Sequence, residues 1–227
     1  MRLLIEQGAE IHEFRQDCTT ALYLAASTTD TEIARLLLEA GADVNARGWD
    51  GRTALMEAAN NGRREMVELL LANGADVNAR PLPLPEDENY GGSTALINAV
   101  RSQHLEIARL LLEHGADVDA VDDSGYTSLM WEAGYAFGEE GSETWKRSVA
   151  IVRLLLEWNA DVNRQNPQKE TALDIAVRGM FGSFDPEEGG ELSEIALLLE
   201  QAGTVRGEPQ PQWCYHAISD ERDTVLP

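Results

Sequence analysis

The sequence predicts an all-α solenoid, a stack of helix-turn-helix units with turn or β-hairpin tips, comprising about five full repeats plus an N-terminal half repeat. The first observation is the string LLL-E-x-G-A-D-V-N at Leu36–Asn45, which recurs with small changes at Leu69–Asn78 and Leu110–Asp119. The second is the triplet T-A-L, which occurs at Thr20, Thr53, Thr94 and Thr171, with the variant T-S-L at Thr127. Successive triplets lie 33, 41, 33 and 44 residues apart, so a unit of 33 residues recurs with insertions of 8 and 11.

Residues 48–79 contain the elements of one unit. We expect a turn at Gly51–Thr53, a short helix at Ala54–Asn60 and a second helix at Arg64–Ala72, whose apolar residues recur at helical spacing. Such a pair cannot bury its apolar surface alone, so neighbouring units must stack against one another.

Several residues mark where these helices begin and end. Thr53 is placed to cap the first helix through its hydroxyl, and the small residues Ala58 and Ala59 allow that helix to pack closely against its neighbours. Gly74 follows the second helix, where a residue in the left-handed conformation would end it. In the fourth full unit Asn159 takes that place, and asparagine is the usual substitute for glycine there.

These residues resemble the ankyrin-repeat family, whose unit has the pattern D-x-x-G-x-T-P-L-H-x-A-A followed by a leucine-rich helix and G-A-D-V-N. The resemblance extends from Arg2 to about Gly203. The boundaries that it implies are the second half of a repeat at 2–14, full repeats at 15–47, 48–79, 80–120, 121–164 and 165–203, and a C-terminal tail at 204–227.

The sequence departs from the family pattern in its first helices. Alanine replaces the proline of most T-P-L triplets, and the family histidine is replaced by Met56, Ile97, Met130 and Asp174. The hydrogen bonds of that histidine are therefore not expected here. Glu132 stands where a small residue is typical, which predicts that the helix Leu129–Ala136 slips by one residue.

The resemblance implies a curved stack whose turn tips and first helices line a concave face, the usual binding surface of the family. The residues that it selects as partner-binding are Trp49, Asp50, Arg52, Asn60, Asn61, Tyr90, Ser93, Asn98, Arg101, Ser102, Asp123, Ser124, Tyr126, Trp131 and Tyr135. Aromatic residues and arginine are enriched among interface anchors because they bury a large area at a small cost in entropy. Alternatively, each aromatic residue at a tip packs only against the next tip.

Three insertions distinguish this chain from a plain array of repeats. The first, Pro81–Tyr90, lies in a tip and begins with P-L-P-L-P, which favours a stiff, extended backbone. The other two, Gly134–Ser148 and Gly179–Ser193, fall between paired helices and each add 11 residues. We expect two stacked extensions, with Ser142 capping a lengthened helix through Glu157 and residues 185–188 opening a short one. The alternative is that these acidic loops are solvated spacers.

The two ends of the chain differ from the repeats between them. Leu3, Leu4 and Ile5 are placed like the buried leucines of later units, but no first helix precedes them. An uncovered end is costly for a solenoid, which predicts either a longer natural protein or self-association through this end. At the other end, Trp213 and Tyr215 either fold back on the last repeat or belong to a flexible tail.

Charge limits the classes of partner. Forty acidic residues against 18 basic ones give a net charge of -22, which repels nucleic-acid phosphates and anionic membranes and favours a basic protein partner.

No apolar run approaches the ~18 residues of a membrane span, and no signal peptide is recognisable. Cys18 and Cys214 lack a paired spacing, which indicates a reducing, cytoplasmic environment with no disulfide and no metal.

The sequence contains no recognisable catalytic motif. The histidines His12, His104, His114 and His216 are scattered, and no nucleophile elbow, H-E-x-x-H helix or glycine-rich phosphate loop occurs. We therefore expect no enzyme activity, no cofactor and no metal site.

Three functions remain. The first is a protein-protein interaction module that binds a basic protein through the concave face. The second is an inhibitor or immunity-like protein that blocks a basic enzyme such as a nuclease, with acidic segments imitating the polyanionic substrate. The third is an ankyrin segment of a larger protein, whose function resides elsewhere.

Overall fold

The computed structural model describes residues 20–48, 50–81, 92–135, 142–178 and 194–203. These residues form ten helices in five successive pairs. The pairs are α2 (Ala21–Ala26) with α3 (Thr31–Glu39), α4 (Ala54–Asn60) with α5 (Arg64–Ala72), α6 (Ala95–Arg101) with α7 (Leu105–Glu113), α8 (Ser128–Tyr135) with α9 (Glu143–Glu157), and α10 (Ala172–Arg178) with α11 (Glu194–Gln201).

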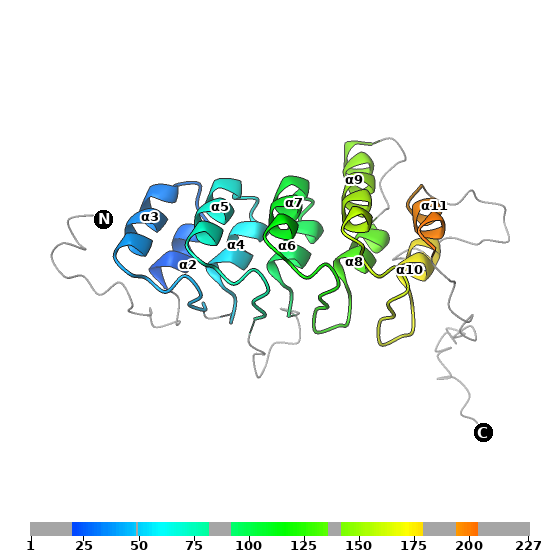
Figure 1. Cartoon of the computed structure of the whole chain (residues 1–227), viewed down its shortest axis with the longest axis horizontal. Helices are drawn as coiled ribbons and strands as arrows, with labels where there is room; N and C mark the ends of the chain where they lie inside the picture. The colour runs from blue at the N-terminus through cyan, green and yellow to red at the C-terminus, as the bar shows by residue number, and fades with distance from the viewer. Residues whose placement is uncertain (1–19, 49, 82–91, 136–141, 179–193, 204–227) are drawn as a thin grey trace, which may run out of the picture.

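The pairs stack side by side into an elongated molecule of two helical layers (Figure 1). The first helices α2, α4, α6, α8 and α10 contact one another in that order, and the second helices α3, α5, α7, α9 and α11 form the other layer. Loops between successive pairs extend together from one side of the stack. Two of these tips carry a single antiparallel bridge, Arg47 with Thr53 and Val121 with Thr127. The predicted all-α solenoid is confirmed.

The threonine of each T-A-L triplet fixes the start of a first helix. Its hydroxyl accepts a hydrogen bond from the backbone N–H three residues later, at 3.1 to 3.4 Å, in Thr20, Thr53, Thr94, Thr127 and Thr171. This bond satisfies one of the N–H groups that a helix leaves unpaired at its N-terminus. The prediction for Thr53 is confirmed.

Left-handed residues end the second helices as predicted. Gly41, Gly74 and Gly115 have φ of 91°, 82° and 86°, and Asn159 has φ of 58° in the fourth unit. Between these ends the core is continuous, with Ala58, Leu70 and the leucines equivalent to Leu70 in the other units fully buried. Each such leucine contributes roughly 1.5 to 3 kcal/mol to the stability of the stack.

The predicted one-residue slip of the helix around Glu132 is wrong. Helix α8 begins in the register of α4. The hydroxyl of Thr127 accepts the backbone N–H of Met130 at 3.2 Å, just as the hydroxyl of Thr53 accepts that of Met56 at 3.4 Å. Glu132 therefore occupies the position of Ala58 and is 0% exposed.

The predicted lengthening of the fourth unit is confirmed. Helix α9 runs for 15 residues, and the hydroxyl of Ser142 accepts a hydrogen bond from the N–H of Trp145 at 3.2 Å. Several expectations lie outside the described residues: the N-terminal half repeat, Cys18, most of Pro81–Tyr90, residues 185–188 and the tail with Cys214.

Candidate functional site

The predicted partner-binding residues divide into supporting and surface positions. Asp50, Ser93 and Asn98 are 4%, 5% and 7% exposed, so they support the tips and first helices from within rather than forming their surface. Trp49 and Tyr90 lie outside the described residues, as does the side chain of Tyr135.

A buried tyrosine joins the first and second units. The hydroxyl of Tyr23 donates to Oδ2 of Asp50 at 2.7 Å, and Oε2 of Glu57 lies 3.4 Å away. Burial, the hydrogen bond to Asp50 and the charges of both carboxylates raise the pKa of Tyr23, so its proton stays in place. Oδ1 of Asp50 also accepts the backbone N–H of Arg52 at 3.1 Å. Asp50 therefore links the tip of the second unit to helix α2 of the first.

In the second unit, the carboxylate of Glu57 bonds to several polar side chains. The guanidinium of Arg52 lies 3.2 Å from Oε2 of Glu57, and the amide of Asn61 donates to Oε1 at 2.6 Å. The neighbouring Asn60 accepts a hydrogen bond from the hydroxyl of Ser102 at 3.2 Å. These predicted contact residues are thus engaged within the stack and offer a partner few unpaired polar groups.

The fourth unit holds its tip with one buried carboxylate. Asp122 is 3% exposed, and its Oδ1 accepts the backbone N–H groups of Ser124 and Tyr126 at 2.9 and 3.0 Å. Its Oδ2 accepts the indole Nε1–H of Trp131 at 2.7 Å. Asp122 therefore fixes the tip and orients the tryptophan of α8 at the same time.

Trp131 is the centre of a cluster that spans two units. The guanidinium carbon of Arg101 lies 4.3 Å from the Trp131 ring centroid, and the ring of Tyr126 lies 5.3 Å from it at 42°. Arg101 is exposed, and both aromatic rings are half-buried. We call Arg101, Tyr126 and Trp131 the aromatic cluster. The structure brings together three residues that the sequence had selected separately.

The outermost tip residues of the fourth unit are exposed. Asp123 lies 3.6 Å from the guanidinium of Arg80 with 59% of its side chain accessible, so this ion pair contributes little to stability. Ser124 is exposed beside it. Both residues are accessible next to the aromatic cluster.

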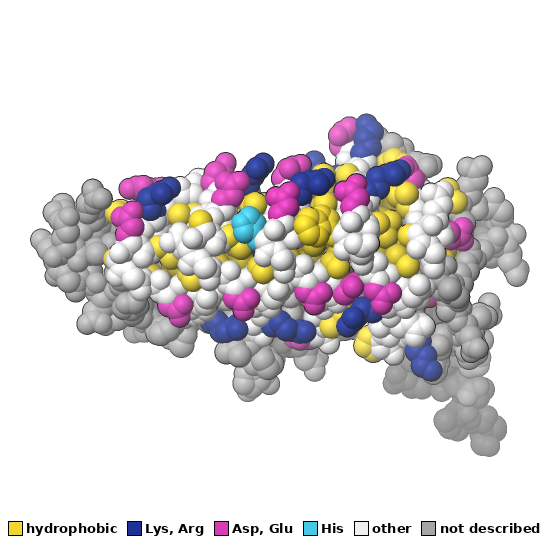
Figure 2. Space-filling model, viewed as in Figure 1, with side chains coloured by type: hydrophobic (Ala, Val, Ile, Leu, Met, Phe, Trp, Pro, Cys, Tyr) yellow, Lys and Arg dark blue, Asp and Glu magenta, His cyan; other side chains and the backbone are white. Residues whose placement is uncertain are grey.

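Exposed aspartates form a second surface feature. Asp43, Asp76, Asp117 and Asp161 follow successive second helices, and Figure 2 shows acidic side chains in line along the molecule. Side-chain oxygens of Asn45, Asn78 and Asp119 accept the backbone N–H groups of Asp76, Asp117 and Asp161, each at 2.8 Å. We call these four aspartates the aspartate row. Hydrogen bonds from the preceding unit hold the backbone of the last three.

Sequence reasoning missed Tyr23, Glu57 and Asp122. A signal existed for Asp122, since an aspartate opening D-x-S-G commonly accepts the N–H groups of its own turn. Tyr23 stands at the helix position where other units have Met56 or Met130, and nothing local indicated its partner in the next unit.

Among the described residues, no helix is both long and apolar enough to cross a membrane, and no three His, Cys, Asp or Glu side chains are grouped to hold a metal ion. A family model described as ankyrin repeats (3 copies) matches residues 1–81 and 83–139. Comparison with curated proteins gives no match.

Proposed function

The chain belongs to the ankyrin-repeat family, whose members are in general protein-protein interaction modules, and we propose that it binds a protein with a basic contact surface. The contact would be made by the tips and first helices of the third and fourth units. The observation that carries this proposal is the aromatic cluster.

The aromatic cluster has the properties of an interface anchor. Two aromatic rings and a guanidinium are accessible together, and the bond from Trp131 to the buried Asp122 holds the indole in one orientation. A side chain that is already ordered loses little entropy on binding, so more of its contact energy contributes to affinity. Tryptophan, tyrosine and arginine are the residues most often found as interface hot spots.

Charge supports a basic partner. The chain carries a net charge of -22, and the aspartate row presents carboxylates along the stack. A field of this sign accelerates encounter with a positively charged surface and disfavours acidic proteins. Affinity should therefore fall as salt concentration rises.

A matched set of variants tests this proposal. The partner would be isolated by affinity capture and its dissociation constant measured by calorimetry for wild type, Tyr126→Ala, Trp131→Ala and Trp158→Ala. Trp158 is 40% exposed at the C-terminal end of α9, in the layer of second helices, and serves as the control. We expect Trp131→Ala to weaken binding by about 30-fold, the effect of a loss of about 2 kcal/mol, and the control to bind like wild type. Equal affinity of all four proteins would reject the proposed face.

The aspartate row favours one second candidate, an inhibitor of a basic enzyme such as a nuclease. Carboxylates at repeating positions resemble the charge pattern of a polyanionic substrate. In that case the captured partner would lose its activity on binding, and Asp76→Asn with Asp117→Asn would weaken the complex more than Trp131→Ala. An interaction module without inhibitory action would leave the activity of the partner unchanged.

A further inference from the structure

Two side-chain contacts join the C-terminal end of α6 to neighbouring residues of α8. Arg101, the last residue of α6, stacks on Trp131, with its guanidinium carbon 4.3 Å from the ring centroid. Gln103, two residues later, donates its side-chain amide to both carboxylate oxygens of Glu132 at 2.8 and 2.9 Å. Trp131 and Glu132 are consecutive residues, so a change in the second contact acts on the turn of α8 that carries the aromatic cluster.

The carboxyl group of Glu132 lies in the core without a charged partner. It is 0% exposed and bonds to two neutral groups, the amide of Gln103 and the hydroxyl of Ser148 on α9. Burying a charge without an opposite charge beside it costs free energy. Burial therefore raises the pKa of Glu132 to about 7, although both hydrogen bonds lower it in part.

These three side chains can form a closed ring of hydrogen bonds only when Glu132 is protonated. The hydroxyl of Ser148 donates to Oε1 of Gln103 at 3.4 Å, and the amide of Gln103 donates to Glu132. A protonated Glu132 can donate its own hydroxyl to Oγ of Ser148, which completes the ring. An ionised Glu132 has no proton to donate. Ser148 must then turn its single hydrogen to the carboxylate, and Oε1 of Gln103 loses its donor.

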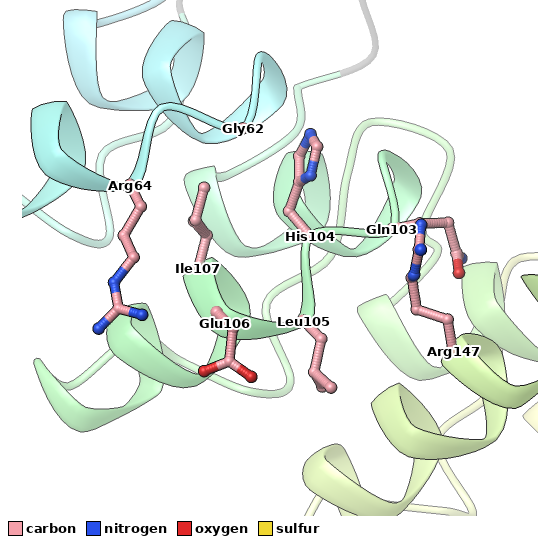
Figure 3. A pocket seen from close by; sticks show the side chains of 8 residues that line it. All are labelled: Gly62, Arg64, Gln103, His104, Leu105, Glu106, Ile107 and Arg147. Carbon is pink, nitrogen blue, oxygen red and sulfur yellow. The ribbon is translucent and has the colours of Figure 1, made fainter. Parts of the chain in front are cut away.

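The charged groups on the neighbouring elements α6, α9 and α10 are engaged elsewhere or exposed. Arg101 lies on the indole of the aromatic cluster, and His104, in the turn after α6, bonds to a backbone carbonyl of the second unit at 3.2 Å. Arg147 of α9 is exposed and lines a groove together with Gln103 and His104 (Figure 3). The other charged residues of α9 are exposed as well: Glu143, Lys146, Arg153 and Glu157. On α10, Asp174 bonds to the threonine that begins its own helix.

We propose that Glu132 is a pH-dependent switch that regulates partner binding at the aromatic cluster. When Glu132 is protonated, the hydrogen-bonded ring closes the junction of the third and fourth units and holds the turn of α8 that carries Trp131. When Glu132 is ionised, the junction loosens, the stack of Arg101 on Trp131 is less ordered, and the partner binds more weakly, because ordering the anchor then costs more entropy. This inference rests on the proposed function of the aromatic cluster.

Fluorine NMR of the full chain labelled with fluorotryptophan tests the switch without a partner. The resonance of Trp131 is assigned by its loss in Trp131→Phe. We expect it to titrate with a midpoint near pH 7 in wild type and not in Glu132→Gln, whose amide cannot ionise. Trp158, at the C-terminal end of α9, is the internal control, and its resonance should not follow this titration.

Ser148→Ala tests the ring without altering the carboxyl group. The hydrogen bond from Ser148 lowers the pKa of Glu132, and a bond to an ionised group is stronger than one to a neutral group. Its loss should move the midpoint of the Trp131 titration upward by about half a pH unit. A midpoint that stays in place would show that the ring does not control the ionisation.

Two further results of the NMR titration would overturn the switch. One is a Trp131 resonance that does not change between pH 5 and pH 9 in wild type. The other is a titration that persists in Glu132→Gln, which would assign the change to a histidine such as His104.

Calorimetry with the captured partner at pH 6 and pH 8 measures the regulation itself. Relative to Glu132→Gln, wild type should bind about 3-fold more weakly at pH 8 than at pH 6. A ratio of the two affinities that stays constant with pH would overturn the regulation. The proposed function fails by a different result, equal binding of Trp131→Ala and wild type, so the two failures are distinguishable.

Discussion

The side-chain nitrogen of Gln103 lies 2.8 and 2.9 Å from the two carboxylate oxygens of Glu132, a contact between the third and fourth units. Glu132 is 0% exposed, and its partners Gln103 and Ser148 are both neutral. Burial raises the pKa of Glu132 to about 7, although the hydrogen bonds from Gln103 and Ser148 lower it in part. A carboxyl in the core thus titrates near neutral pH.

Glu132 should make the stack less stable as pH rises towards neutrality. Its pKa is about 7 in the folded chain against an ordinary value of 4.5, so between these values the folded state binds more protons than the unfolded state. The free energy of unfolding therefore falls as pH rises through this window, by a contribution on the order of 3 kcal/mol from this one group.

The measurement is urea unfolding of wild type and Glu132→Gln between pH 5 and pH 8. Other carboxylates titrate in both proteins, so the informative quantity is the difference between their free energies of unfolding. We expect the variant to gain stability relative to wild type as pH rises, because its amide cannot ionise. The exposed Glu106→Gln controls for loss of a surface charge. A difference that stays constant with pH would contradict the raised pKa of Glu132.

Gly62→Ala should destabilise the chain more than Gly74→Ala. Both glycines have positive φ, 69° and 82°, so alanine is strained at either position at a cost of about 1 kcal/mol. Only at Gly62 does the added Cβ meet another group, His104, while nothing lies within 4 Å of a Cβ at Gly74. We expect an additional loss of about 1 to 2 kcal/mol at Gly62.

Thermal and urea unfolding of both variants measure this difference. The double variant Gly62→Ala with His104→Ala should recover part of the additional loss, since the clash is with the imidazole. Equal destabilisation by the two single substitutions would show that backbone strain alone determines the cost.

Asp119→Asn should stabilise the junction of the third and fourth units. Asn45 and Asn78 each accept a backbone N–H from the next unit and donate their amide to the carbonyl of Gly74 or Gly115, at 3.4 and 3.0 Å. Asp119 stands at the same position and accepts from Asp161, but a carboxylate has no proton to donate.

The side-chain amide introduced by this substitution would supply that donor, and we expect a gain of about 0.5 to 1 kcal/mol in the free energy of unfolding. The control Asp117→Asn removes the same charge, and its side-chain oxygen can still accept the N–H of Asp119. An equal gain from both variants would assign the effect to charge rather than to the new hydrogen bond.

Asp122→Asn should disturb Trp131 more than it disturbs the fold. Asn166 occupies the equivalent tip position in the fifth unit, and its Oδ1 accepts the N–H groups of Gln168 and Glu170 as Asp122 accepts those of its own turn. An asparagine at this position can therefore keep the turn, but its amide then meets the indole N–H of Trp131, and two donors cannot bond.

We expect Asp122→Asn to weaken binding of the proposed partner by several-fold while the melting temperature changes by a few degrees at most. The control Asp123→Asn removes an exposed carboxylate from the same tip. Partner affinity unchanged by Asp122→Asn would argue against a role for the orientation of Trp131.

Most of the fold could be predicted from the repeat strings, because each helix and turn depends on residues within its own unit. The capping threonines, the left-handed ends at Gly74 and Asn159, and the Ser142 cap of α9 all follow from local rules of helix ends. These features could be read from spacing and residue type alone.

Contacts between units could not be read in the same way. Gln103, which contacts Glu132, is a non-glycine residue with φ of 60°, a conformation that its residue type disfavours. Tyr23 contacts Asp50 from a helix position that is apolar in the units with Met56 and Ile97. Such pairs depend on two non-equivalent positions of neighbouring units, so one repeat consensus does not contain them.

Added salt should raise the melting temperature. The chain has a net charge of -22, and successive members of the aspartate row stand at equivalent positions of adjacent units, so folding brings like charges together. Salt screens this repulsion, with a screening length of about 10 Å at 0.1 M. It also weakens the ion pairs, but these are mostly exposed and contribute little.

Thermal melts with increasing sodium chloride measure which of the two effects of salt dominates. A variant with Asp43→Asn, Asp76→Asn and Asp117→Asn should melt at a higher temperature in low salt and gain less from added salt than wild type. A melting temperature that falls with sodium chloride would mean that the exposed ion pairs, and not the repulsion among carboxylates, dominate the surface electrostatics of the stack.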